Sequence, residues 1–328
     1  MIDQATARRF ARDLDKLVPE GVRLGIAVSG GPDSLALLLL AAEVRPGSVE
    51  AASVDHRLRP DSRGEAQCVA ELCAGMDVPH RILSVDIARG ASVQAQARAA
   101  RYCALERWGG MHGLATVATG HHLDDQAETL LMRLARGAGV GGLAGVRAER
   151  ALGALVLVRP LLGWRKTELE AVVAASGIIA IDDPSNRDPR HDRSRVRAFL
   201  DQEKWLDPGR LAASAGHLAE AEEALGWSLN RLADERIAGD EAGLSVAASD
   251  LPNEYQRRLL LEAMRRLGSD CVRGSDAERA LGSLRSGKRC TLGGLLLEGG
   301  DRWRLSPAPI ARKRGPQSGS SGSSTESD

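Results

Sequence analysis

The sequence predicts an α/β protein with a Rossmann-like parallel sheet, followed by a small, mostly helical domain with a terminal β-hairpin. Short β-prone runs near 23–28, 49–54, 80–85 and 114–119 alternate with helical patterns, which is typical of a parallel sheet covered by helices. A glycine-rich turn joins the first of these runs to a helix. Beyond about residue 205, long amphipathic segments rich in Ala, Leu, Glu and Arg replace the alternation.

The elements of the first domain are expected in the following order. Residues 1–19 form an amphipathic helix with Phe10, Leu14 and Leu17 on one face. The helices between the strands are expected at about 34–45, 61–76 and 91–109. Another strand near 154–158, a helix over Lys166–Ser176 and an arginine-rich loop over 184–197 complete the domain.

The second domain is expected to contain helices over 209–237 and 251–268. A strand from Cys290 to Glu298, a Gly299-Gly300-Asp301 turn and a strand from Arg302 to Leu305 form its hairpin. We therefore divide the chain into an α/β domain (1–205), a helical domain with a terminal hairpin (206–311) and a Gly/Ser-rich, disordered tail (312–328).

Composition narrows the class of protein. The 328 residues carry a formal net charge of zero, so any basic surface must be local. The five cysteines are scattered without a Cys-x-x-Cys pair, which argues against a zinc site or a disulfide framework. No signal-peptide core or membrane-length apolar run is present. These features predict a cytoplasmic protein without a membrane partner, and they leave open whether it is a monomer or a homodimer.

A candidate anion site lies at the first strand-to-helix turn, Ser29-Gly30-Gly31-Pro32-Asp33-Ser34. Glycines let backbone amides approach a ligand closely, and the free N–H groups of a helix N-terminus favour phosphate. The loop is not a Walker A loop, because Asp33 stands where that motif has Lys. An acid at this position suits Mg²⁺ bound together with a pyrophosphate.

A second candidate segment, Gly120 to Thr129, contains two histidines and three acids. Asp125 and Glu128 are three residues apart and share one helical face. They could grip an ammonium group or help to hold Mg²⁺. The alternative is an N-capped helix whose acids are favourably placed at its positive end. The adjacent His121 and His122 do not have the spacing of zinc ligands.

The first loop resembles the pyrophosphate loop of the N-type ATP pyrophosphatases. The Gly120 block resembles the second signature of one branch of that group, the tRNA(Ile)-lysidine synthetase family. Further blocks resemble this family in the same order, and the terminal hairpin is similar to that of its short members. These blocks are residues 54–59, 96–102, 136–143, 159–162 and 182–186.

The resemblance implies an enzyme that adenylates C2 of the wobble cytidine in a CAU anticodon and then joins L-lysine there, releasing AMP and diphosphate. The product pairs with A, so the codon that the tRNA reads changes from AUG to AUA. The amino-acid identity of the tRNA changes from methionine to isoleucine. It also implies roles for individual residues: Ser29, Gly30, Gly31, Pro32, Asp33, Ser34, Asp55, His56 and Gly120 bind ATP, Asp33 holds Mg²⁺, Asp125 and Glu128 bind lysine, and Asp33, Asp125 and Arg98 are catalytic.

The segment 186–197 contains five arginines and two aspartates and has a local charge of +3. Guanidinium groups suit phosphate oxygens, and such contacts position RNA without reading its sequence. We predict that Arg193, Arg195 and Arg197 contact tRNA. The alternative is a solvated loop with internal Arg–Asp pairs.

Three other functions are weighed against this one. A tRNA thiolase on the same ATP loop would need cysteines near the site, and an ammonia-using ligase such as an NAD synthetase would not need the arginine-rich segment. A non-catalytic RNA-binding protein would not need the intact ATP loop. The sequence favours lysidine synthesis over all three.

Overall fold

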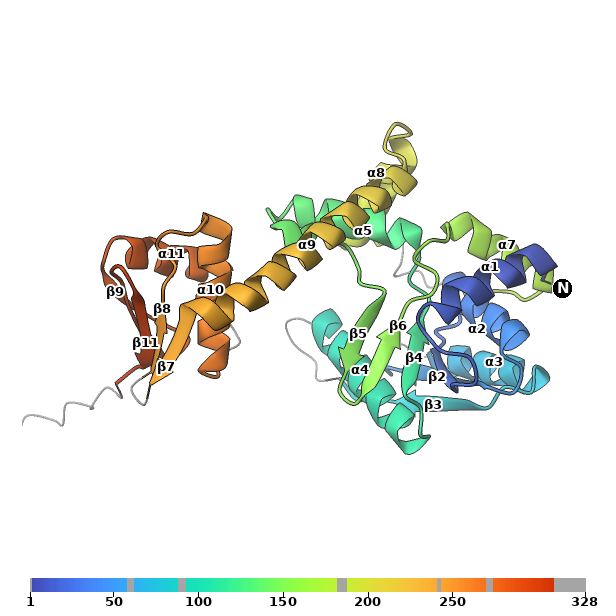
Figure 1. Ribbon diagram of the computed structural model, residues 1–328. Helices are drawn as coiled ribbons and strands as arrows, with labels where there is room; N and C mark the ends of the chain where they lie inside the picture. Colours follow the sequence, from blue (N-terminus) through green and yellow to red (C-terminus); the bar gives the residue numbers. More distant parts are fainter. Residues whose placement is uncertain are drawn as a thin grey trace, which may run out of the picture. The chain divides into compact units, whose positions relative to one another are not determined.

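The computed structural model describes residues 2–57, 62–87, 93–181, 188–240, 243–269 and 274–309. The chain divides into two compact units, Met1–Glu222 and Glu223–Asp328. The division falls inside one long helix, α9 (Pro208–Arg236), whereas the sequence-based boundary precedes that helix. Figure 1 labels the elements.

The first unit is built on a six-stranded sheet with the order β3-β2-β1-β4-β6-β5. All neighbours pair in parallel except β5, which is antiparallel to β6. The five strands expected from the sequence are present, and the edge strand β5 was not expected. The strands are β1 (Leu24–Ala27), β2 (Val49–Asp55), β3 (His80–Ser84), β4 (Thr116–Thr119), β5 (Glu149–Leu152) and β6 (Leu155–Val158).

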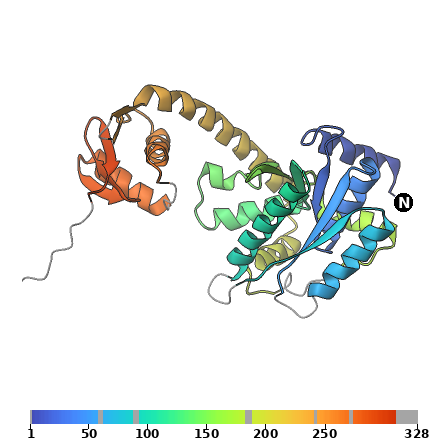
Figure 2. The same ribbon diagram turned by 90° about the horizontal axis from the view of Figure 1, so that it is seen from below.

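Helices cover both faces of this sheet (Figures 1 and 2). One face packs against α1 (Gln4–Asp15), α2 (Pro32–Val44), α3 (Ser62–Gly75) and α7 (Lys166–Ser176), around a core that includes Phe10 and Trp164. The other face packs against α4 (Val93–Met111) through Leu105 and Trp108. The middle of helix α2 is apolar on all sides, which is typical of a helix that is buried all round, and its central residues are all buried.

Three further helices lie beyond β4: α5 (Leu123–Leu134), α6 (Val140–Leu143) and α8 (Asp192–Gln202). The prediction of a loop over 184–197 is wrong from residue 192 onward, because α8 begins there. Its first turn contains Asp192, an acid that favours a helix N-terminus. The last of the family-like blocks, 182–186, lies outside the described residues.

The second unit contains more strand than the sequence predicted. Its hairpin belongs to a five-stranded antiparallel sheet with the order β7-β8-β11-β10-β9. The strand expected over 290–298 is divided by a Gly293-Gly294 turn, where both glycines have positive φ. Its elements are β7 (Ile237–Asp240), β8 (Gly243–Val246), α10 (Asn253–Arg266), α11 (Gly274–Arg285), β9 (Arg289–Leu292), β10 (Leu295–Glu298) and β11 (Trp303–Pro307).

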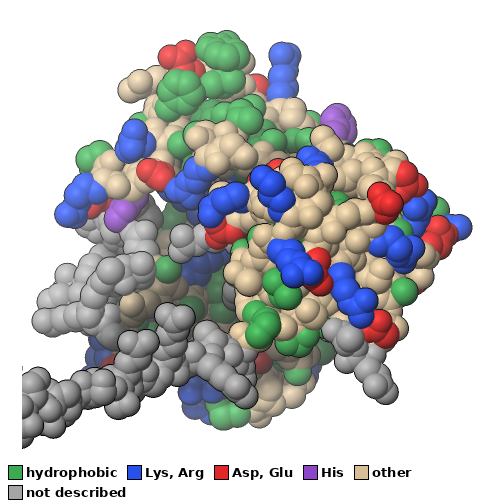
Figure 3. Space-filling model, turned by 90° about the vertical axis from the view of Figure 1, so that its left-hand side faces the viewer, with side chains coloured by type: hydrophobic (Ala, Val, Ile, Leu, Met, Phe, Trp, Pro, Cys, Tyr) green, Lys and Arg blue, Asp and Glu red, His purple; other side chains and the backbone are tan. Residues whose placement is uncertain are grey.

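The core of this unit packs one side of the sheet against α10 and α11, and it includes Leu259, Leu281 and Trp303. On the face drawn in Figure 3, basic side chains are interspersed with acidic ones. Every helix in the described ranges is too short or too polar to cross a lipid bilayer.

Candidate active site

The loop between β1 and α2 is closed by its two serines. Ser34 Oγ accepts a hydrogen bond from the Ser29 N–H at 3.1 Å and donates one to the Gly31 carbonyl at 3.0 Å. Gly31 is the N-cap of α2, so the free N–H groups of the first turn face the loop. The predicted strand–loop–helix corner is therefore present, with the geometry of an anion site.

Two glycines let other segments approach this loop closely. Gly30 has φ of +84°, and its carbonyl accepts a hydrogen bond from the Ile181 N–H at 2.9 Å. A Cβ on Gly30 would overlap the Ile181 side chain, and a Cβ on Gly120 would lie 2.8 Å from the Asp33 carbonyl oxygen. Gly120 directly follows β4, and its missing side chain allows the end of β4 to approach the N-terminus of α2.

His122 is buried among three carboxylates. Its Nε2 lies 3.5 Å from Asp33 Oδ2 and 3.7 Å from Asp125 Oδ2, and its Nδ1 lies 3.6 Å from Asp124 Oδ2. Burial disfavours the charged imidazole, but Asp124, Asp33 and Asp125 outweigh burial and raise the pKa of His122 to about 10. The His122 imidazolium therefore joins the ATP loop to α5.

The link from His122 to Asp33 was not predicted, because the sequence pattern raised His122 only as a metal ligand. The available signal was its place before a helix with acids at positions 124 and 125. Its backbone N–H donates to Asp125 Oδ2 at 3.1 Å, as an N-cap with an acid three residues later predicts. Desolvation would raise the pKa of Asp124, but His122 and the Lys166 N–H lower it to about 2.

We expect His122 to make unfolding pH-dependent. Its pKa is about 10 when folded and ~6.5 when unfolded, so its stabilisation is complete below pH ~6.5 and disappears as pH rises through 10. The loss is ~5 kcal/mol at most. Urea unfolding at pH 6, 8 and 10 should give a falling free energy for the parent and a flatter profile for His122→Asn. His217→Asn, an exposed site, is the control. Identical profiles for parent and His122→Asn would contradict the charged state.

His121 has the opposite protonation state. Burial lowers its pKa to about 3 against the attraction of Asp125, and Arg159, Arg101 and Arg193 lower it further. Its Nδ1 lies 2.9 Å from Thr119 Oγ1. Two adjacent histidines therefore carry different charges at neutral pH because their neighbours differ.

The two acids expected to bind lysine lie together and are buried, with Asp125 8% and Glu128 2% exposed. Arg193 Nε donates to Glu128 Oε2 and Arg197 Nε to Glu128 Oε1, each at 2.7 Å. Arg193 also lies 3.4 Å from Asp125. Burial would raise the pKa of Asp125, but His122 and Arg193 lower it.

The three arginines expected to contact tRNA thus have different surroundings. Arg193 and Arg197 are four residues apart on one face of α8 and hold Glu128, whereas the Arg195 side chain is 69% exposed and 3.7 Å from Asp192. The structure brings two of them into the acid site and leaves the third at the surface.

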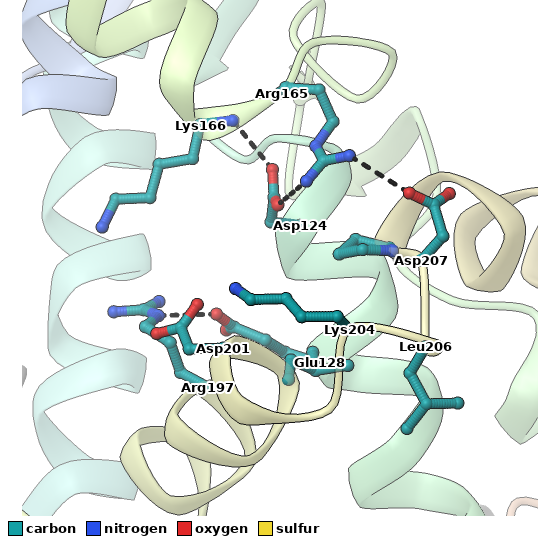
Figure 4. Close-up of a pocket in the computed structure, with 11 residues that line it drawn as sticks. Asp124, Glu128, Arg165, Lys166, Arg197, Asp201, Lys204, Leu206 and Asp207 are labelled. Carbon is teal, nitrogen blue, oxygen red and sulfur yellow. Dashed lines mark hydrogen bonds and ion pairs between the residues drawn. The ribbon is translucent and has the colours of Figure 1, made fainter.

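A cavity of about 270 Å³ opens beside Glu128 (Figure 4). Its walls come from α5, the N-terminus of α7, α8 and the start of α9. Arg165 connects two of its acids, lying 3.3 Å from Asp124 and 3.6 Å from Asp207. The lining residues are Asp124, Glu128, Arg165, Lys166, Arg197, Leu200, Asp201, Lys204, Leu206, Asp207 and Pro208. The cavity is lined by both signs of charge.

Asp55 and His56 follow β2 at the same edge of the sheet. Asp55 Oδ1 accepts hydrogen bonds from the Arg57 N–H at 2.9 Å and Ser62 Oγ at 2.7 Å. Burial would raise the pKa of Asp55, but these bonds lower it. Burial, together with the charge of Arg101, lowers the pKa of His56. Asp55 is therefore charged and fixed beside the loop.

Arg98 lies on α4 and is exposed, with its guanidinium 5.1 Å from the centre of the Tyr102 ring. Within the described ranges, no three His, Cys, Asp or Glu side chains are grouped as metal ligands. Asp33 nevertheless offers an oxygen: its Oδ1 is buried and has no hydrogen-bond partner in the described part of the chain.

Comparison with known proteins gives consistent results. A PP-loop domain model matches residues 3–204. The chain is 46% identical to the tRNA(Ile)-lysidine synthase of Novosphingobium aromaticivorans (93% of this chain, 95% of the relative) and 41% identical to that of Zymomonas mobilis (90% and 91%).

A solved structure, the U34-tRNA thiolase NcsA from Methanococcus maripaludis, shares the fold with a TM-score of 0.54. It is 19% identical and covers 66% of this chain and 78% of the thiolase. The family-model match and the two close relatives agree with the anion loop and the acid-bearing helix described above. The chain therefore belongs to the tRNA(Ile)-lysidine synthase family, within the group of PP-loop ATP-utilising proteins.

Proposed function

We propose that this enzyme uses ATP to join L-lysine to C2 of the wobble cytidine in a CAU-anticodon tRNA(Ile). One observation carries the proposal beyond family membership. The anion loop and the buried acids of α5 meet at one edge of the sheet, with His122 between them. Such an edge is where parallel α/β sheets bind their ligands. A cytoplasmic location, where tRNA and ATP are available, fits this activity.

In the first step, the C2 oxygen of cytidine bonds to the α-phosphorus of ATP and the bond to pyrophosphate breaks. The Ser29–Ser34 loop binds the phosphates, with Asp55, His56 and Gly120 beside it. Asp33 would hold Mg²⁺, because its unpartnered oxygen lies at the loop and Mg²⁺ is commonly bound by one or two carboxylates together with substrate phosphates. The bound ion would neutralise charge on the departing pyrophosphate.

In the second step, the ε-nitrogen of lysine bonds to C2 and AMP leaves with the former C2 oxygen. Free lysine arrives with an ammonium group of pKa ~10.4, which must lose a proton before it attacks. The cavity beside Glu128 suits lysine, because its acids fit ammonium groups and Lys166 and Lys204 fit a carboxylate. Asp125, nearer to His122 and the ATP loop, is the acid assigned to the reacting amine.

The tRNA is assigned two kinds of contact. Arg195 is exposed on α8 and suits a backbone phosphate. We assign to the second unit, which has its own core and sheet, further contacts with parts of the tRNA outside the anticodon. A thiolase activity is the alternative, and the structural neighbour named above supports it only at the level of the fold.

The test is incubation of the full chain with ATP, Mg²⁺, labelled lysine and tRNA(Ile) bearing a CAU anticodon. We expect ATP-dependent transfer of label to this tRNA, with AMP and pyrophosphate formed in equal amounts. The elongator tRNA(Met), which shares the anticodon, is the control. Entry of sulfur from labelled cysteine, or equal use of ammonia, would contradict the proposal.

A further inference from the structure

Two aromatic side chains are exposed where α8 ends and the chain turns into α9 (Figure 1). Phe199, in the last turn of α8, is 47% exposed, and Trp205, in the connection to α9, is 75% exposed. The other aromatic side chains of the first unit are buried: Phe10, Tyr102, Trp108 and Trp164. Two exposed rings so close in sequence leave apolar surface in water and indicate a binding surface. We call Phe199 and Trp205 the aromatic rim.

The rings of the aromatic rim are carried by an ordered turn. The Glu203 N–H donates to the Phe199 carbonyl, and the Leu206 N–H donates to the Glu203 carbonyl, each at 2.9 Å. Trp205 Nε1 donates to Glu203 Oε2 at 3.0 Å. Because the only polar group of the indole has a partner, its two apolar faces remain for contacts with a ligand. A ring that is already oriented loses little conformational entropy when a ligand binds.

The aromatic rim borders the cavity beside Glu128 (Figure 4). Leu200, which follows Phe199, and Lys204, which precedes Trp205, both line that cavity. The two rings do not line it, so they lie outside it, at its edge. If lysine occupies the cavity, C2 of the wobble cytidine must come within bonding distance of the lysine ε-nitrogen. The anticodon loop then passes the aromatic rim.

The same face of α8 also offers a cation and an amide. Arg195, Phe199 and Gln202 are exposed and follow one another at intervals of four and three residues, so they share one side of the helix. A guanidinium suits a backbone phosphate, a ring stacks on a base, and an amide hydrogen-bonds to a base edge. A purely apolar partner would need neither the cation nor the amide. The combination therefore favours single-stranded RNA as the ligand.

We propose that the aromatic rim stacks on unpaired bases of the anticodon loop, next to the wobble cytidine. Stacking on Phe199 or Trp205 replaces the contacts of such a base with its neighbours in the loop, which leaves the cytidine free to face the cavity. Every base has a π-face, so the rings contribute affinity and position and do not read the sequence. The inference rests on the proposed function for the identity of the RNA.

The variants are Trp205→Ala and Phe199→Ala, which remove one ring each, and Trp205→Phe, which keeps a ring. Met111→Ala is the matched control, because Met111 is a 78% exposed hydrophobic side chain at the end of α4. The chain passes from there to the start of β4, at the edge of the sheet opposite the site. All four replacements are at exposed positions, so urea unfolding should match the parent.

The affinity of the full chain for tRNA(Ile) with a CAU anticodon is measured at several KCl concentrations, without ATP or lysine. We expect Trp205→Ala to bind about tenfold more weakly, a loss in the range for one stacked base. The slope of log K against log salt should be unchanged, because an indole neutralises no phosphate. Trp205→Phe should stay within threefold of the parent, and Met111→Ala should equal it.

Two further RNAs, joined from synthetic halves, each lack one of the bases that neighbour the wobble cytidine. For one of these abasic RNAs, the parent should bind about tenfold more weakly and Trp205→Ala should add no further loss. Losses that add fully for both RNAs would overturn the stacking, as would unchanged affinity of Trp205→Ala and Phe199→Ala for the natural RNA. A parent dimer that these variants convert to monomers, with no change in RNA affinity, would assign the rim to a second copy of the chain.

The failure of this inference can be told from failure of the proposed function. A parent that incorporates lysine while both alanine variants bind tRNA as it does would count against the aromatic rim alone. A parent whose tRNA binding depends on the rings, but which fails to incorporate lysine, would count against the proposed function alone.

Discussion

Asp33→Ala is expected to abolish formation of AMP and pyrophosphate while leaving the protein folded. Asp33 lies in the first turn of α2 with one oxygen free of hydrogen bonds in the described structure and the other 3.5 Å from His122. Its loss removes the carboxylate proposed to hold Mg²⁺ against the departing pyrophosphate. Losing one such electrostatic contribution costs ~3–4 kcal/mol, which is about 10²–10³-fold in rate. The measurement is release of labelled pyrophosphate in the presence of tRNA.

The matched control is Glu43→Ala, an exposed acid in the last turn of the same helix. It should retain the parent rate. Asp33→Asn separates charge from shape: it should be as inactive as Asp33→Ala, and NMR titration should give a lower pKa for His122 because one of its three carboxylates is neutralised. An Asp33→Ala enzyme within threefold of the parent rate would exclude this role.

The double variant Arg193→Ala/Arg197→Ala is expected to lose ~3–5 kcal/mol of stability, because Glu128 would remain buried without a partner. Urea unfolding measures the loss. Arg195→Ala removes an exposed arginine from the same helix and should stay within ~0.5 kcal/mol of the parent. Equal stability of the two variants would show that the buried Glu128 carboxylate does not need the arginines of α8 as partners.

A third variant identifies the cause of this destabilisation. Adding Glu128→Leu to the double variant removes the unpaired charge, so part of the lost stability should return. Binding of tRNA is then best tested on Arg195→Ala, which should bind more weakly with a smaller salt slope while its unfolding is unchanged. The two measurements distinguish an arginine that contacts RNA from one that holds the acid site together.

The elements with strong local signals were predictable. The five parallel strands and the Ser29–Ser34 corner were expected from periodicity and glycine placement, and α7 has its expected bounds. Strand β5 was missed because Glu149–Leu152 is short and only its last residue is buried. The Gly293-Gly294 turn had a sequence signal, but the apolar residues around it suggested one continuous strand.

The site was predicted less completely, because its contacts join distant parts of the chain. The arginine-rich segment had a local charge of +3 that suggested RNA, but Arg193 lies 65 residues from its partner Glu128. No spacing rule connects residues so far apart. His122 was misjudged for a related reason: its neighbour Asp33 belongs to another segment, and only the carboxyl edge of the sheet brings the two together.

The length of the turn between β5 and β6 is constrained more tightly than the turn length of an ordinary surface hairpin. Only Gly153 and Ala154 separate the paired Leu152 and Leu155, and Arg150 pairs with Leu157. Successive side chains of a strand point to opposite faces, so shifting the register by one residue turns Arg150 away from Tyr102. A single-residue insertion or deletion that shifts this register would redirect the charge of Arg150, although the turn itself lies at the opposite end of β6 from Arg159.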